Sequence, residues 1–142
     1  MILTNNYDES QYIYKDRPVY DFFKRFLDLF IAIILLFLLS PVFLIIIVIL
    51  KISYKQNVFY FQERVGQHGK IFKIYKFRTM KLNAEDIEPV WAKPDDERCT
   101  VFGKILRKTS IDELPQLINI IAGNLSIVGP RPERPFFMKD HV

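Results

Sequence analysis

LFIAIILLFLLSPVFLIIIVIL, residues 29 to 50, decides the fold class because it carries no charged side chain and a single polar one, Ser40. As an α-helix this run would extend about 33 Å, close to the thickness of the hydrocarbon core of a bilayer. It begins well inside the chain, is longer than the apolar part of a signal peptide and lacks a small-residue cleavage site. The run therefore predicts a helix inserted in a membrane.

A proline interrupts this run at its middle, directly after Ser40. Pro41 removes one helical hydrogen bond and crowds the preceding turn, and a serine hydroxyl can satisfy the freed carbonyl, so we expect a bend. Basic residues flank both ends of the run, and the positive-inside rule gives no clear orientation; they are Lys24, Arg25, Lys51 and Lys55. The residues leave two alternatives, a kinked helix that spans the bilayer and a broken helix that enters and leaves by one cytoplasmic face.

The apolar run divides the chain into three segments. Residues 1–17 carry no helical apolar period and predict a mobile tail. Residues 18–55 form the membrane-inserted segment, in which Asp28 lies within helical reach of Lys24 and Arg25 and is expected to form an ion pair. Residues 56–142 form a cytoplasmic region. The single Cys99 excludes an internal disulfide framework and fits a reducing setting.

The cytoplasmic region predicts one hairpin, followed by a loop. Residues 57–65 and 70–78 are β-rich and are separated by Gly-Gln-His-Gly, which favours a β-hairpin. Residues 82–98 are polar, contain two prolines and predict a surface loop.

Two short helices are expected after this loop. Thr100 is placed to cap the first, in which Val101, Phe102, Ile105 and Leu106 share a face opposite three basic residues, a pattern typical of the membrane surface. Apolar residues at helical spacing from Leu114 to Ile121 indicate the second, and Gly123 is placed to end it. The expected fold class is therefore α+β and mostly helical, with amphipathic interfacial helices and a small β-hairpin.

TSIDELPQL, residues 109–117, contains two adjacent carboxylates, Asp112 and Glu113. Their structural interpretation is a helix start, because Ser110 and Glu113 have the spacing of a capping box, or Asp112 is itself the cap. Their chemical interpretation is a reactive pair. Neighbouring side chains on a helix diverge by about 100°, so one carboxylate can attack a substrate while the other holds a metal ion.

Cations suited to phosphate oxygens accompany the two acids in the sequence; they are Lys76, Arg78, Arg107, Lys108 and Arg131. For each of them, a solvated face or a contact with lipid headgroups is the alternative. The net charge of +4 understates how strongly residues 70–81 and 104–108 are basic. A membrane segment nearby favours anionic lipid or a phosphorylated substrate as the partner. No nucleic-acid partner is expected, because the basic residues adjoin an apolar stripe rather than exposed aromatic side chains.

Five motifs, in order, resemble the bacterial sugar transferases, also called monotopic phosphoglycosyl transferases. They lie in residues 18–137 and read FKRFLDLFIAIILLFLLSPVFL, FQERVG, GKIFKIYKFRTM, LRKTSIDELPQLIN and SIVGPRPE. The resemblance implies a re-entrant membrane helix broken at Ser40-Pro41, in the bacterial cytoplasmic membrane, with residues 56–142 as the catalytic region facing the cytoplasm. It implies that Asp112 is the nucleophile, that Glu113 binds or positions Mg²⁺, and that Arg107 and Arg131 belong to the phosphate-binding surface.

The activity implied by the resemblance is transfer of a sugar 1-phosphate from a UDP-sugar to a polyprenyl phosphate. It proceeds through a covalent aspartyl phosphosugar and initiates surface glycan synthesis. Family members usually continue beyond the Pro-Arg-Pro motif with a further Arg-, Pro- and Gly-rich stretch, whereas this chain ends at Val142. The alternatives are therefore an inactive, truncated family member and a non-catalytic binding module anchored in the membrane.

Overall fold

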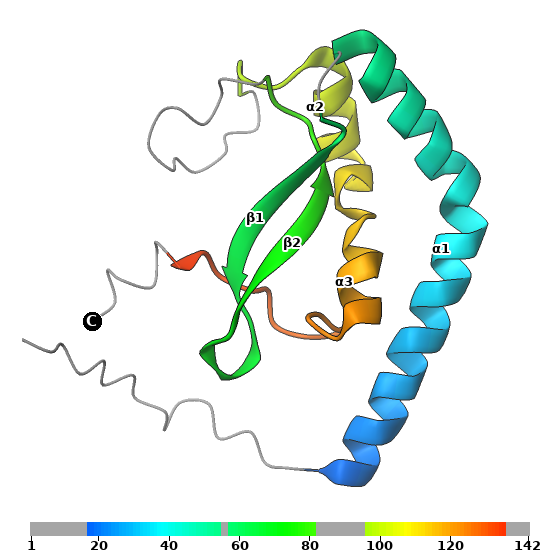
Figure 1. Cartoon of the computed structure of the whole chain (residues 1–142), viewed down its shortest axis with the longest axis vertical. Coiled ribbons are helices and arrows are strands. Elements are labelled where there is room, and N and C mark those ends of the chain that lie inside the picture. Colours follow the sequence, from blue (N-terminus) through cyan, green and yellow to red (C-terminus); the bar gives the residue numbers. More distant parts are fainter. Residues whose placement is uncertain (1–16, 55–56, 82–95, 136–142) are drawn as a thin grey trace, which may run out of the picture.

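The computed structural model of the protein describes residues 17–54, 57–81 and 96–135. A long helix, α1, is followed by a two-stranded antiparallel hairpin and two short helices (Figure 1). Their bounds are α1 (Pro18–Tyr54), β1 (Phe59–Val65), β2 (Ile71–Phe77), α2 (Val101–Lys108) and α3 (Gln116–Ala122), with 3₁₀ turns η2 (Gln67–Gly69) and η4 (Ile111–Glu113). The predicted hairpin is confirmed. Most of the predicted loop and of the predicted tail lies outside the described residues.

Helix α1 continues through Pro41 without a break in its helical backbone, so the helix break expected at Ser40-Pro41 is not seen, and re-entry into the membrane stays a prediction. Pro41 has no N–H to donate to the carbonyl of Phe37, and the Ser40 hydroxyl donates to that carbonyl instead, at 2.7 Å. The expected replacement of the lost bond is therefore confirmed, and the helix bows along its length (Figure 1). By length and composition α1 can cross a membrane, and most of its apolar side chains are exposed.

The largest apolar cluster joins the C-terminal half of α1 to the hairpin and α2. Phe77, at the end of β2, is its centre, with 1% of its surface exposed. Its ring lies 5.3 Å from that of Phe43 on α1 and 5.6 Å from that of Phe59 on β1, both measured between centroids. Burying one such ring contributes about 1.5–3 kcal/mol. Leu50 and Leu106 belong to the same cluster, so β2 is fixed against α1.

Helix α2 starts as the sequence predicts, because the Thr100 side chain accepts a hydrogen bond from the backbone N–H of Gly103 at 3.0 Å. Its expected apolar face is divided. Leu106 is buried in the core, whereas Val101 and Ile105 are 82% and 55% exposed. Only part of that face packs on the protein, and its contact with a membrane surface stays a prediction.

The N-terminal half of α1 is attached to α3 by a polar clasp, which consists of Lys24, Arg25 and Asp28. Arg25 donates to the carbonyls of Ile120 and Ile121, at 2.6 and 2.8 Å, and so satisfies the C-terminus of α3. Gly123 ends that helix at a φ of +85°, as predicted.

The clasp also holds the chain that follows α3. The predicted ion pair between Lys24 and Asp28 is present at 3.1 Å. Lys24 also donates to the Ser126 hydroxyl, and Asp28 accepts from the backbone N–H of Ile127 at 3.3 Å. Helix α1 therefore fixes the start of the loop that leads to Arg131.

We expect Arg25→Met to lower the free energy of unfolding by about 1.5–3 kcal/mol, because it keeps the apolar stem but removes a charged donor from two carbonyls. The matched control is Lys51→Met, which changes an exposed cation on the same helix. Urea unfolding of both variants in detergent micelles measures the difference. Equal midpoints for the two variants would show that the clasp contributes nothing to stability.

Candidate active site

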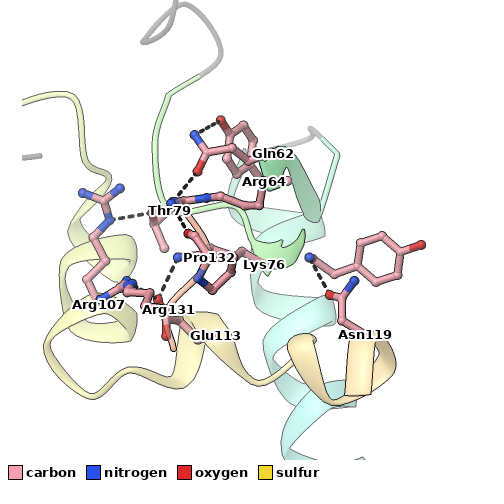
Figure 2. Close-up of polar contacts among 11 residues, drawn as sticks. Gln62, Arg64, Lys76, Thr79, Arg107, Glu113, Asn119, Arg131 and Pro132 are labelled. Carbon is pink, nitrogen blue, oxygen red and sulfur yellow. Dashed lines mark hydrogen bonds and ion pairs between the residues drawn. The ribbon is translucent and has the colours of Figure 1, made fainter. Parts of the chain in front are cut away.

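Three elements meet at the side chain of Glu113, which lies in η4. Lys76, near the end of β2, places its Nζ 2.7 Å from Oε1 of Glu113. Arg131, in the loop after α3, places its Nη2 3.2 Å from the same oxygen (Figure 2). Lys76 is the more enclosed partner, with 17% of its side chain exposed against 76% for Arg131. Glu113 therefore has a half-buried ion pair on one side and a solvent-facing cation on the other.

The two adjacent carboxylates have different environments. Asp112 is 8% exposed, and its burial raises the pKa of its carboxyl; the charges of Lys76 and Arg107 oppose this shift, while Glu113 adds to it. Burial alone would also raise the pKa of Glu113, but the hydrogen bond and charge of Lys76, aided by Arg131, bring that pKa below its usual value. A pair of acids with pKa values driven apart is typical of two different chemical roles.

The capping-box interpretation is wrong, and neither acid caps helix α3. Ser110 has a φ of 57°, in the left-handed region, and its side chain makes no capping hydrogen bond. Helix α3 begins only at Gln116, after the buried Pro115, whose missing N–H costs nothing at a helix start. Asp112 and Glu113 instead occupy the tight turn between α2 and α3.

Arg107 reaches the site from the last turn of α2. Its Nε donates to the hydroxyl of Thr79 at 2.9 Å, and its charge acts on both Asp112 and Asp96. Arg78, another predicted phosphate-binding residue, has a buried Nε without a hydrogen-bond partner among the described residues. The structure thus brings Lys76, Arg107 and Arg131 to the acids, and it gives Arg78 no bond to either of them.

Two residues that the sequence analysis passed over support this arrangement. Asn119, with 1% of its surface exposed, accepts from the backbone N–H of Tyr75 at 3.0 Å (Figure 2). It also donates to the carbonyl of Lys73 at 2.7 Å. It pairs with the free edge of β2 as a neighbouring strand would. Its role could have been suspected from the sequence, because Asn119 is a polar residue inside the apolar stretch of α3. Thr79, within the KFRTM motif, carried no such signal.

The loop that carries Arg131 is held at its far end by β1. Arg64 donates to the carbonyl of Pro132 at 2.9 Å, and the backbone N–H of Val65 donates to the carbonyl of Glu133 at 2.9 Å. The near end is held by the polar clasp on α1. Attachment at both ends restricts where Arg131 can lie and directs it to Glu113.

The sequence matches one described protein family over most of its length. The sequence model described as bacterial sugar transferase matches residues 19–142. The chain therefore belongs to the bacterial sugar transferase family.

Individual relatives carry more specific names. The UDP-N-acetylgalactosamine-undecaprenyl-phosphate N-acetylgalactosaminephosphotransferase of Aeromonas hydrophila is 40% identical over 88% of this chain and 32% of its own length. The exopolysaccharide production protein ExoY of Sinorhizobium fredii is 44% identical over 82% of this chain and 58% of its own length. The UDP-glucose:undecaprenyl-phosphate glucose-1-phosphate transferase of Klebsiella pneumoniae is 43% identical over 78% of this chain and 24% of its own length. The chain thus spans about a quarter to three fifths of these relatives.

Asp112→Asn is expected to stabilise the protein near neutral pH. The raised pKa means that the folded state holds the Asp112 proton more tightly than the unfolded state, so stability falls as pH rises from the ordinary value of 3.8 through the raised one. A neutral amide escapes this penalty. The melting temperature of the variant minus that of the parent should therefore increase between pH 4 and pH 7. A constant or decreasing difference would contradict the pKa shift.

Proposed function

We propose that the chain transfers a sugar 1-phosphate from a UDP-sugar to a polyprenyl phosphate, through a covalent aspartyl phosphosugar, and so initiates surface glycan synthesis. The observation that carries the proposal is the buried Asp112 beside Glu113, within the field of Lys76 and Arg107. The relatives' names support the substrates, since they specify undecaprenyl phosphate with UDP-N-acetylgalactosamine or UDP-glucose. These names differ in their sugars, and we assign none to this chain.

The proposed reaction has two displacements at phosphorus. In the first, a carboxylate oxygen of Asp112 attacks the β-phosphorus of the UDP-sugar, and the bond to the bridging oxygen breaks, so that UMP leaves with the electron pair. In the second, an oxygen of the polyprenyl phosphate attacks the same phosphorus and displaces Asp112. The products are UMP and a polyprenyl diphosphate sugar. Asp112 returns to its starting carboxylate.

The environment of Asp112 suits a nucleophile of this kind. A buried carboxylate is poorly hydrated, so it loses little solvation when it attacks. The charges of Lys76 and Arg107 oppose the rise in its pKa that burial causes. The negative charge that develops on the phosphoryl oxygens needs donors that are already in place. We assign this binding role to Lys76, Arg78, Arg107 and Arg131. Lys76 and Arg131 hold Glu113 as well, so the phosphate groups and this carboxylate would share them.

We propose Mg²⁺ as the cofactor, held or positioned by Glu113. Among the described residues no group of three or more His, Cys, Asp or Glu side chains is placed to hold a metal ion. This fits Mg²⁺, which in nucleotide enzymes often takes one or two carboxylates and completes its shell with phosphate and water. When bound, the ion would neutralise charge on the diphosphate. Glu113, with its lowered pKa, remains an ionised oxygen ligand at neutral pH.

We place the chain in the bacterial cytoplasmic membrane, with α1 re-entrant and residues 56–142 facing the cytoplasm. The support is that both halves of α1 contact the part of the chain that follows it, which carries the charged groups of the site. Arg25 is bound to α3, and Leu50, about 37 Å further along a helix, packs with Phe77 and Leu106. A straight span would carry one of these contacts across the bilayer, where the charged groups of the site would lose their water. The apolar helix would then bring a lipid acceptor to a soluble donor.

Cysteines at Arg17 and Ser53, near the two ends of α1, test this topology in a Cys99→Ser background. If the helix re-enters, an impermeant thiol reagent should label neither position in sealed cells and both after permeabilisation. Pro41→Ala restores the missing donor and favours a continuous span, so one position should become partly labelled. Labelling of only one position in the parent would contradict the re-entrant helix.

The reaction itself is tested by UMP release from UDP-glucose and UDP-N-acetylgalactosamine with Mg²⁺. The parent should release UMP and, without acceptor, gain the mass of a phosphosugar. Asp112→Asn should lose both, with a rate at least tenfold lower, or about 1.4 kcal/mol of barrier, while it still sediments with membranes. Glu63→Gln, which changes an exposed carboxylate on β1, is the matched control. An Asp112→Asn variant that keeps more than about a tenth of the parental rate would rule out Asp112 as nucleophile. A parent that releases no UMP would favour the non-catalytic binding module.

A further inference from the structure

Thr79 lies at a crossing of two chain segments, where β2 has just ended and α2 begins. The residue is 6% exposed. Its backbone carbonyl accepts from the backbone N–H and the hydroxyl of Thr100, at 2.9 and 3.2 Å. Its own hydroxyl oxygen accepts from Nε of Arg107 at 2.9 Å. The backbone of Thr79 thus anchors α2, and its side chain is left for Arg107.

The crossing is unusually close. A Cβ atom on Gly103 would lie 2.1 Å from the carbonyl oxygen of Thr79, well inside van der Waals contact. Only glycine fits there, so α2 is pressed against the residue that follows the strand. Arg107 stands four residues after Gly103, hence one turn later on the same face of the helix. The backbone therefore presents Arg107 to Thr79 at a fixed distance.

The hydrogen bond to Thr79 uses only one of the five N–H donors of Arg107. Figure 2 shows the two terminal nitrogens directed away from Thr79, and within the described part of the chain they donate no hydrogen bond. A bond at Nε fixes the plane of the guanidinium and leaves its fork of terminal donors open. Such a fork matches two phosphate oxygens. The charge of Arg107 acts on Asp112, so the fork lies within electrostatic range of the nucleophile.

We propose that Thr79 is a positioning residue, whose hydroxyl orients the guanidinium of Arg107 so that its terminal nitrogens bind the phosphate groups of the donor beside Asp112. This inference rests on the proposed function and adds a residue to it. A free arginine side chain samples many rotamers, and fixing it before the substrate binds removes that cost from the reaction. The benefit should appear in the transition state, where the phosphoryl charge is largest.

Two substitutions at Thr79 separate the hydroxyl from the shape of the side chain. Thr79→Val keeps the size and removes the acceptor, and it should lower kcat/KM for the UDP-sugar at least about tenfold, as loss of a hydrogen bond to a charged group does. Thr79→Ser keeps the acceptor and should stay within about threefold of the parent. Thr109→Val is the matched control at the end of the same helix, because the Thr109 hydroxyl donates only to carbonyls of α2.

A double-mutant cycle with Arg107→Lys distinguishes positioning from a general loss of structure. Lysine has no Nε–H donor in a guanidinium plane, so the Thr79 hydroxyl has nothing to orient in that background. In that background, Thr79→Val should lower kcat/KM for the UDP-sugar less than about twofold. The positioning role is wrong if Thr79→Val lowers kcat/KM as much in the Arg107→Lys background as in the parent. It is also wrong if the single variants Thr79→Val and Thr79→Ser have equal kcat/KM values. Should Thr79→Val fail to fold, Thr79→Ala makes the same comparison.

Measurements without turnover separate this inference from the proposed function. In lipid nanodiscs, the Nε–H of Arg107 should give a slowly exchanging NMR signal that Thr79→Val removes, and UDP with Mg²⁺ should bind at least several-fold more weakly to that variant. A parent that releases no UMP would defeat the proposed function alone, provided that these two effects remain. An unprotected Nε–H, UDP binding unaffected by Thr79→Val, or no UDP binding by the parent would overturn the inference.

Discussion

The ion pair between Lys76 and Glu113 is the interaction on which the arrangement of the site depends. It joins β2 to the turn between α2 and α3, and Arg131 adds the following loop to the same carboxylate. An exposed pair of this kind would contribute little, but this one is half-buried and its lysine approaches from a strand that is itself fixed. Phe77, the next residue, is buried against α1, and Asn119 pairs with the edge of β2. The packing of β2 thus fixes Lys76, and Lys76 in turn fixes the position of the Glu113 carboxylate.

Helix α1 contributes to the site as well as to the exposed apolar surface of the protein. Its apolar side chains are mostly exposed, which suits lipid, while its opposite side carries the polar clasp and the core residues that hold the hairpin. Lys24 and Asp28 hold the start of the loop that leads to Arg131. A shift of α1 would therefore move this loop and change the contact between Arg131 and Glu113. The position of α1 and the position of Arg131 beside Glu113 are therefore linked.

The two adjacent acids differ in how far their burial is compensated. Asp112 is buried, and its pKa is raised because the nearby cations only partly offset the loss of water. Glu113, one residue away, is stabilised by direct contact with Lys76. Strain concentrated in one short turn is typical of a functional site. Ser110, in the left-handed region directly before this turn, supports the same view.

The sequence by itself determined the features that are local or periodic. The apolar run predicted α1, the Ser40-Pro41 pair predicted how its lost hydrogen bond is replaced, and Thr100 and Gly123 predicted the ends of two helices. These succeed because the partners lie within four residues of each other. The motifs also indicated the family, and residue chemistry was enough to predict the acids and cations of the site.

Only the tertiary structure decided which of these residues meet. The capping-box interpretation of Ser110 and Glu113 failed because Ser110 makes no capping hydrogen bond and the Glu113 side chain is paired with Lys76, which is distant in sequence. The apolar face of α2 is divided because Leu106 packs in the core, whereas Val101 is exposed. Thr79 and Asn119 bind groups 28 and 44 residues away in the chain. No periodicity records such pairs, since the free energy of a buried polar contact depends on the whole surrounding fold.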